Sequence, residues 1–180
     1  MLAVALAGIL AASPPAMAAS QSSATPAVVR AHPSPSHAVV AGCETRFVWP
    51  LRGASQATMT AVFAPPARPW LPGHRGVDLS ADTGAELVSP AQGTVSFAGR
   101  VGGKDVVSIR HGDGHGTTTY EPAVASVRVG ASVRRGEPFG RVEGDSDHCG
   151  GSCLHWGLRV GDGYADPTAL TRPRRIALKQ

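Results

Sequence analysis

Three side chains of metal-ligating type, His74, Asp78 and His155, stand at positions from which they can reach one metal ion. His74 and Asp78 are four residues apart, and His155 lies in the segment Cys153-Leu-His-Trp-Gly-Leu-Arg159. A catalytic zinc ion commonly takes three nitrogen or oxygen ligands from the protein and keeps a fourth position open for water or substrate. Two imidazoles and one carboxylate meet this requirement.

The backbone around these residues must bring them together. In an extended chain His74 and Asp78 point to the same face but stand roughly 13 Å apart, so the backbone has to bend between them, and Gly76 is predicted to permit the bend. Around His155 apolar and other residues alternate, which places Leu154 and Trp156 on one face of a strand and His155 on the other. One face is predicted to enter the core and the other to form a site.

The composition favours short strands. The chain has 22 glycines and 15 prolines, few aromatic residues and 42% apolar residues, enough for one domain with a core. An all-β fold is therefore expected. Strands are predicted over residues 94–98, 106–111, 117–121, 126–129, 138–142 and 153–160, and residues 111–116 are predicted to form a hairpin loop.

Four segments resemble, in this order, the core motifs of the M23 (lysostaphin-type) peptidoglycan endopeptidases. They are Gly73–Leu79, Pro90–Val95, Gly130–Gly140 and Leu154–Leu158, and the resemblance covers about residues 70–168. It implies a two-layered antiparallel β core and a Zn²⁺ ion held in a groove by the two histidines and the aspartate. It also implies cleavage of peptide bonds in peptidoglycan cross-bridges or stems.

Two positions depart from the family pattern. The family's His-x-His motif here begins with Cys153, and Glu121 stands where the resemblance implies a second catalytic imidazole. Those imidazoles would assist the attacking water and stabilise the developing oxyanion. Glu121 is the first candidate for the general base, and His148, in the loop before the ligand strand, is the other.

The cysteines allow two interpretations. Cys149-Gly-Gly-Ser-Cys153 is short and flexible enough to close by a disulfide in an exported chain, which would fix the loop before His155. Alternatively, His148, Cys149, Cys153 and His155 together form a zinc site. Cys43 is left over, either free or paired with another molecule.

Four regions are predicted along the chain. Residues 1–18 are predicted to be a signal peptide, because an apolar run too short to span a bilayer precedes Ala16-Met-Ala18. Residues 19–42 have the Ala/Ser/Pro composition of a disordered linker, residues 43–171 are the M23-like domain with its core at 70–168, and residues 172–180 are a basic tail. A secreted, cell-wall-associated protein is expected.

The charge of the chain and its predicted export limit the classes of binding partner. Of the 17 cationic residues 15 are Arg, and four basic residues follow residue 171. Peptidoglycan peptides are the expected substrate, and the tail suits anionic wall polymers. Nucleic acid is not expected, because export removes it and no aromatic residues interleave the charges. No segment of the mature chain is expected to span a membrane.

Three functions fit the sequence. The first is a secreted zinc metalloendopeptidase that hydrolyses peptidoglycan. The second is a catalytically degenerate relative that binds zinc and wall peptide and regulates another wall hydrolase. The third is a biotinyl or lipoyl carrier domain modified at Lys104, which export disfavours because the ligating enzymes are then absent. A wall-digestion assay separates the first two.

Overall fold

The computed structural model describes residues 45–55, 58–112, 114–148 and 152–173, all within the compact unit of residues 39–180. The predicted signal peptide and linker, and all but the first two residues of the basic tail, lie outside the described residues, so those regions stay predictions. No helix in the described part of the chain is long and apolar enough to cross a membrane.

The described residues form eleven strands and a 3-10 helix. They are β1 (Met59–Ala61), β2 (Gly76–Ser80), β3 (Glu86–Val88), β4 (Gly93–Val101), β5 (Lys104–His111), β6 (Thr117–Glu121), β7 (Val124–Ala125), β8 (Ser132–Val133), β9 (Pro138–Arg141), β10 (Cys153–Val160), β11 (Gly163–Ala165) and η3 (Pro167–Leu170).

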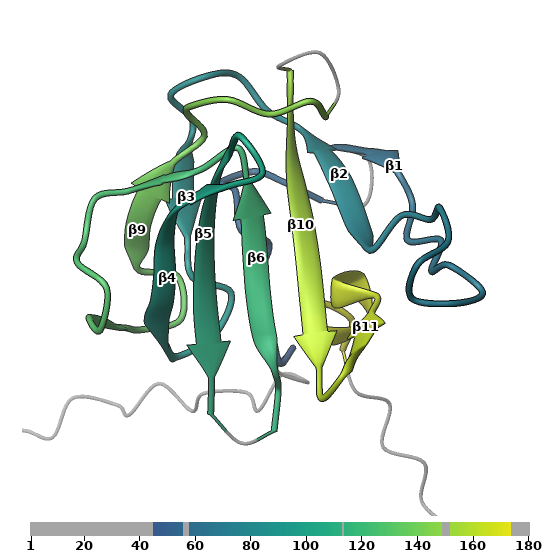
Figure 1. Ribbon diagram of the computed structural model, residues 1–180. Helices are drawn as coiled ribbons and strands as arrows, with labels where there is room; N and C mark the ends of the chain where they lie inside the picture. The colour runs from purple at the N-terminus through teal and green to yellow at the C-terminus, as the bar shows by residue number, and fades with distance from the viewer. Residues whose placement is uncertain (1–44, 56–57, 113, 149–151, 174–180) are drawn as a thin grey trace, which may run out of the picture. The chain divides into compact units, whose positions relative to one another are not determined.

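Two antiparallel sheets pack face to face. The larger follows the order β1-β2-β10-β6-β5-β4-β8, with β11 paired to β10, and the smaller follows β3-β9-β7. In Figure 1 the long strands β4, β5, β6 and β10 stand side by side, with β3 and β9 behind them. The expected all-β, two-layered antiparallel fold is confirmed.

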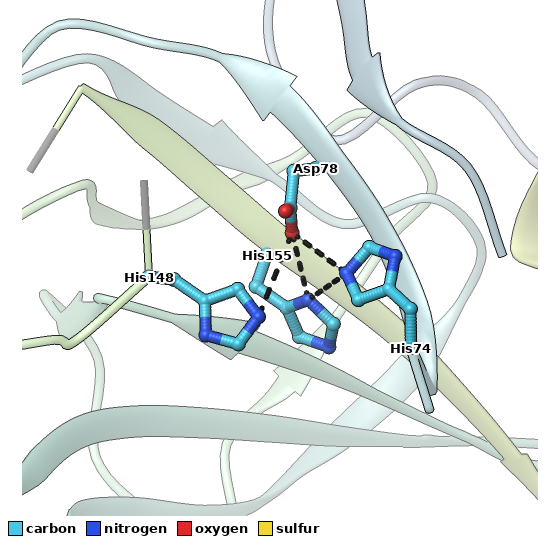
Figure 2. A group of neighbouring side chains, drawn as sticks. All are labelled: His74, Asp78, His148 and His155. Atoms are coloured by element: carbon cyan, nitrogen blue, oxygen red, sulfur yellow. Dashed lines mark hydrogen bonds and ion pairs between the residues drawn. The ribbon is translucent and has the colours of Figure 1, made fainter. Parts of the chain in front are cut away.

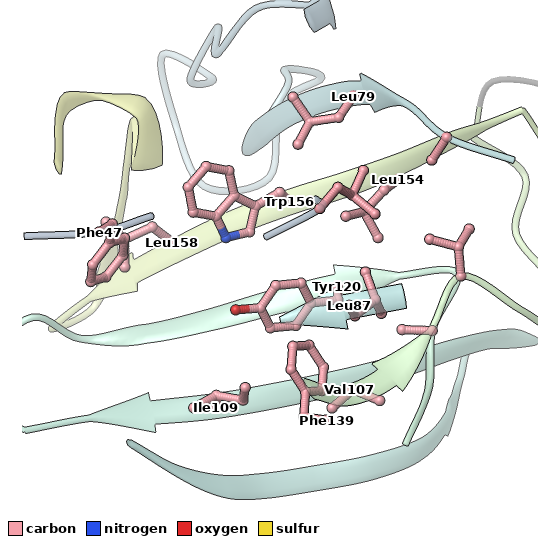
Figure 3. Close-up of a cluster of buried hydrophobic side chains, with 14 of the residues drawn as sticks. Phe47, Leu79, Leu87, Val107, Ile109, Tyr120, Phe139, Leu154, Trp156 and Leu158 are labelled. Atoms are coloured by element: carbon pink, nitrogen blue, oxygen red, sulfur yellow. The ribbon is translucent and has the colours of Figure 1, made fainter. Parts of the chain in front are cut away.

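The core lies between the two sheets (Figure 3). Strand β10 contributes Leu154, Trp156 and Leu158, each at most 2% exposed, as its alternating sequence predicts. From the smaller sheet Phe139 packs its ring against Tyr120 of β6, with ring centroids 4.7 Å apart. Because these residues fill one face of the larger sheet, the side chains that alternate with them are left on the opposite face.

Five of the six predicted strands are present, but the one predicted over residues 126–129 is wrong. The chain instead pairs earlier, through β7, and the last bond of this ladder runs from Ser126 N to Phe139 O. Residues 126–131 then turn back toward β8, with Gly130 at a φ of 88°, a conformation that glycine adopts without strain. The alternation of residues 126–129 therefore belongs to a turn.

The β5–β6 connection is the predicted hairpin, and it buries His111. The amide of His111 donates to Gly116 O at 2.9 Å. Its Nδ1 donates to Gln92 O at 3.1 Å, which leaves Nε2 to accept from the Thr118 hydroxyl at 2.8 Å. The ring is 6% exposed, and this burial lowers the pKa of His111. The side chain is therefore a neutral member of the core.

Acidification is expected to destabilise the fold through His111. In the unfolded chain this imidazole takes up a proton near pH 6.5, whereas in the fold it does so only at lower pH. Its contribution to the free energy of unfolding is therefore present above pH 6.5 and lost as the pH falls below it, by on the order of 1 kcal/mol per pH unit. Urea unfolding at pH 7.5 and 5.5 measures this loss, and a His111→Gln variant should lose less. An equal loss in both proteins would contradict the assignment.

Candidate metal centre and groove

Two neighbouring strands position the metal-ligating residues. Strands β2 and β10 pair so that Asp78 lies directly opposite His155. Both are flanked in their strands by core residues, because Leu79 and Leu154 form the next pair of the ladder and are fully buried. The period of two along each strand therefore turns the carboxylate and the imidazole to the same outer face of the sheet.

The third residue, His74, stands just before β2. Its backbone is held by two hydrogen bonds with Ala64, and the chain bends at Arg75 before β2 begins. The predicted bend is present, but Gly76 serves packing: a Cβ there would lie 2.4 Å from Trp156 O and 2.8 Å from His155 Nε2. Only a residue without a side chain lets the two strands approach this closely.

The donor atoms of the three residues converge (Figure 2). His74 Nε2 lies 3.0 Å from Asp78 Oδ1 and 3.0 Å from His155 Nδ1, and His155 Nδ1 lies 2.8 Å from the same carboxylate oxygen. The three side chains are between 9% and 19% exposed. Two imidazole nitrogens and one carboxylate oxygen are therefore gathered at one partly buried point.

A contact on the far side of the His74 ring fixes its orientation. His74 Nδ1 lies 2.6 Å from Val62 O, and because a carbonyl only accepts, Nδ1 carries the proton. The lone pair of Nε2 then faces the Asp78 oxygen. A carbonyl behind the ligand imidazole is typical of metal sites, because it sets both the tautomer and the ring direction.

The Asp78 carboxylate is ionised at neutral pH. Burial alone raises its pKa, but the hydrogen bond from His155 and the charges of the neighbouring imidazoles outweigh burial and lower the pKa below the usual value. An anionic oxygen facing two nitrogen donors is a suitable site for a cation. The donor set therefore fits a metal ion of the zinc type.

His148 joins this group from the loop before β10. One ring nitrogen of His148 and the donor atoms of His74, Asp78 and His155 all lie within 4.8 Å of one another. Its Nε2 is 4.0 Å from Asp78 Oδ1, and its ring is stacked on that of His74. Figure 2 shows the ring beside the other three residues. His148 and His155 therefore group with His74 and Asp78, and the alternative site with Cys149 falls partly outside the described residues.

The other candidate base, Glu121, lies one strand away. It is paired with His155 in the β6–β10 ladder, but its Oε1 accepts a hydrogen bond from Ser146 Oγ at 2.8 Å and lies 3.3 Å from Lys104 Nζ. The same oxygen is 3.7 Å from His148 Nδ1. Glu121 therefore contacts His148 and is not among the residues grouped with Asp78.

Three residues of this network are not apparent from the sequence. Lys104, Ser146 and Asp147 come from the start of β5 and the loop before His148, and Lys104 Nζ lies 2.5 Å from Asp147 Oδ1. The ion pair with Asp147 is the main cause of a raised pKa of Lys104. Lys104 is thus a charged member of the site. The one local signal is Gly102-Gly103, whose tight turn brings Lys104 toward the end of β6.

The same donors fall inside a region that matches a known family. The model of peptidase family M23 matches residues 72–167, more than half of the chain. The chain belongs to peptidase family M23. The match contains His74, Asp78 and His155, so both metal-ligating imidazoles are present. Because the matched region belongs to a peptidase family and includes Lys104, the interpretation of Lys104 as the modified residue of a carrier domain is wrong.

Relatives of this M23 domain are found in bacteria. An uncharacterized protein of Mycobacterium tuberculosis is 38% identical over 141 residues, which are 76% of this chain and 55% of the relative. A DD-carboxypeptidase/endopeptidase, Mpg, of Neisseria meningitidis is 33% identical over 101 residues, which are 56% of this chain and 23% of the relative. The chain spans about half the length of the mycobacterial relative.

Solved structures have the same fold. A zinc containing peptidase from Vibrio cholerae superposes with a TM-score of 0.57 at 21% identity, and the match covers 73% of this chain and 40% of that chain. At this identity the likeness shows the fold alone. It agrees with the two-sheet arrangement of this M23 domain.

A groove leads away from the metal-ligating residues of the M23 domain across the outer face of the larger sheet. Its cavity measures about 600 Å³ and is lined by residues that include His155, Glu121, Phe97, Arg159 and Tyr164. Gly157, between His155 and Arg159 on β10, adds no side chain to this face. An extended chain can therefore lie along the floor with one end at the donor group.

The predicted Cys149–Cys153 disulfide stays a prediction. Cys153 is buried at the start of β10, but Cys149 lies outside the described residues. Cys43 also lies outside them. Whether a disulfide joins the loop that holds His148 to the start of β10 can be tested by measuring the free thiols of the purified protein.

Proposed function

We propose that this M23 domain is a zinc-dependent endopeptidase that cleaves peptides of peptidoglycan in the bacterial cell wall, outside the cytoplasm. The convergence of His74, Asp78 and His155 at the end of an open groove is the observation that carries the proposal. Membership of peptidase family M23 supports it, as does the DD-carboxypeptidase/endopeptidase among the relatives.

His74, Asp78 and His155 would hold the zinc ion. When bound, zinc lowers the pKa of coordinated water toward about 7 and polarises the carbonyl of the scissile peptide bond. The protein contributes the fixed ring of His74, the ionised carboxylate and the β2–β10 ladder, which together keep the donors in place. The groove would hold the substrate peptide in an extended form beside them.

We propose that His148 is the general base and that Glu121 positions it. The nearest His148 nitrogen lies with the donor group, whereas the Glu121 oxygen is engaged by Ser146 and Lys104. The sequence favours Glu121 as the general base, whereas these contacts favour His148 as the base and Glu121 as the residue that positions it. His148 would take a proton from the attacking water and pass it to the leaving amine, since an imidazole exchanges protons near neutral pH.

A second candidate function is binding without cleavage. His148 offers a nitrogen within 4.8 Å of the other three donors, so it can serve as a fourth protein ligand and close the position that a substrate needs. The protein would then bind zinc and wall peptide and regulate another hydrolase.

Digestion of purified cell walls tests the two candidates. The full chain, loaded with one equivalent of zinc, is expected to release peptide fragments with new amino termini that mass spectrometry identifies. A chelator should stop the release, and added zinc should restore it. Zinc binding at full stoichiometry without any released fragment, on walls of several cross-link types, would contradict the endopeptidase and support the binding function.

A further inference from the structure

A second cavity lies at the other end of the long strands. It measures about 710 Å³ and is lined by the segment Thr45–Arg46, the start of β4, the end of β5 with the hairpin that follows, and the loop after β8. In Figure 1 this is the end of β5 near the β5–β6 hairpin, whereas the metal-ligating residues Asp78 and His155 lie on β2 and near the start of β10. No residue of this cavity lines the groove or belongs to the donor group.

The charge of this cavity has one sign. Its lining includes Arg46, Arg110 and Arg135 and contains no aspartate or glutamate. Within the described ranges none of these three arginines forms an ion pair with a carboxylate, whereas Arg52 and Arg100 each do. Three positive charges without a carboxylate partner among the described residues repel one another, so an anion bound among them is favoured.

Part of the cavity wall is fixed in advance. The Arg135 guanidinium donates from Nη2 to Thr45 Oγ1 at 2.8 Å and to Thr45 O at 3.3 Å, and its remaining N–H groups are not engaged by any described residue. His111 at the back is neutral and hydrogen-bonded on both ring nitrogens. Thr94 and Ser132, paired across β4 and β8, add hydroxyl groups to the lining.

The lining also includes a glycine, Gly93, at the start of β4. Gly93 stands where a Cβ would lie 2.7 Å from Arg110 O and 2.9 Å from His111 Nδ1. Any larger residue would have to displace the end of β5. The strand ends are thus packed closely behind the cavity, and its shape does not depend on flexible side chains alone.

We propose that this cavity binds a phosphate group. Guanidinium groups form paired N–H···O bonds with phosphate oxygens, and a lining that takes three arginines from separate segments suits a tetrahedral anion better than a planar carboxylate. The cavity is larger than one phosphate ion, so it also admits phosphate within a phosphodiester polymer. Because the groove lies elsewhere, the domain can hold such an anion and a peptide at the same time.

Calorimetric titration of the full chain tests this site. The probes are inorganic phosphate and a glycerol phosphate oligomer, in chloride buffer at constant ionic strength. We expect saturable binding at one site per chain, and at least a tenfold weaker affinity in the Arg110→Gln/Arg135→Gln double variant. The Arg68→Gln/Arg128→Gln variant removes the same charge outside the cavity and should bind as the unmodified protein does.

The outcomes are distinct. Binding of both probes assigns the site to phosphate in general, and binding of the oligomer alone assigns it to a polymer. No saturable binding of either probe, or an equal loss in both double variants, would overturn the proposal. Single Arg110→Gln and Arg135→Gln variants, each severalfold weaker, serve if the double variant is unstable. Zinc content is expected to be unchanged throughout, so this test is independent of the proposed hydrolysis.

Discussion

An Asp78→Ala protein is expected to keep its fold and lose most of its zinc. The Asp78 oxygen is the atom that His74 and His155 both contact, and without it two imidazoles remain as ligands. Loss of a ligand should weaken zinc affinity by more than the roughly 10- to 100-fold seen when supporting partners are removed. Metal analysis after dialysis, followed by titration against a chelator, measures the change.

The matched control is Asp82→Ala. Asp82 is an exposed aspartate in the loop after β2, so its removal changes the charge equally without touching the donors. We expect this variant to retain one zinc per chain. Stoichiometric zinc of unchanged affinity in the Asp78→Ala protein would rule out the assigned ligand set.

A His148→Ala protein is expected to bind zinc and to hydrolyse wall peptides about 10² to 10⁴ times more slowly. The three ligands are untouched, whereas the group that takes the proton is removed. Added imidazole should restore part of the rate, because it can replace a missing base but cannot repair a misfolded site. Fragment release over time, with zinc content measured in parallel, gives both readouts.

Glu121→Gln separates positioning from proton transfer. The amide keeps the size of the side chain but weakens its contact with His148, so kcat should fall by about tenfold with KM unchanged and without rescue by imidazole. His37→Ala, in the predicted linker, is a control for loss of an imidazole. If Glu121→Gln abolishes hydrolysis and His148→Ala does not, Glu121 is the base.

The three metal-ligating residues could be predicted from the sequence, because strand alternation and short local motifs determine their positions. Alternation in residues 153–160 puts Trp156 in the core and His155 outside it, and the order of four motifs then joins His155 to His74 and Asp78. The two-layered fold follows from the same motifs. These inferences depend on strand periodicity and on short segments, which a single sequence contains.

Contacts between loops that lie far apart in the sequence could not be predicted. Lys104 meets Asp147 across 43 positions, and nothing in either segment indicates the other. The arginines of the second cavity come from three segments, and in the sequence none of them differs from an ordinary surface residue. Residues 126–129 show that alternation also occurs in a turn, where the partner strand and not the local pattern decides whether a strand forms.

The position of β10 has a consequence for how the site is assembled. This strand lies between β2 and β6, although both precede it in the chain. During synthesis β2 and β6 therefore have no shared neighbour until residues 153–160 have emerged, and Asp78 waits without His155 opposite it. A nascent or truncated chain that ends before β10 holds only part of the donor set. The complete donor set thus arises in one step, when β10 is inserted, and we expect zinc uptake during refolding to report that step directly.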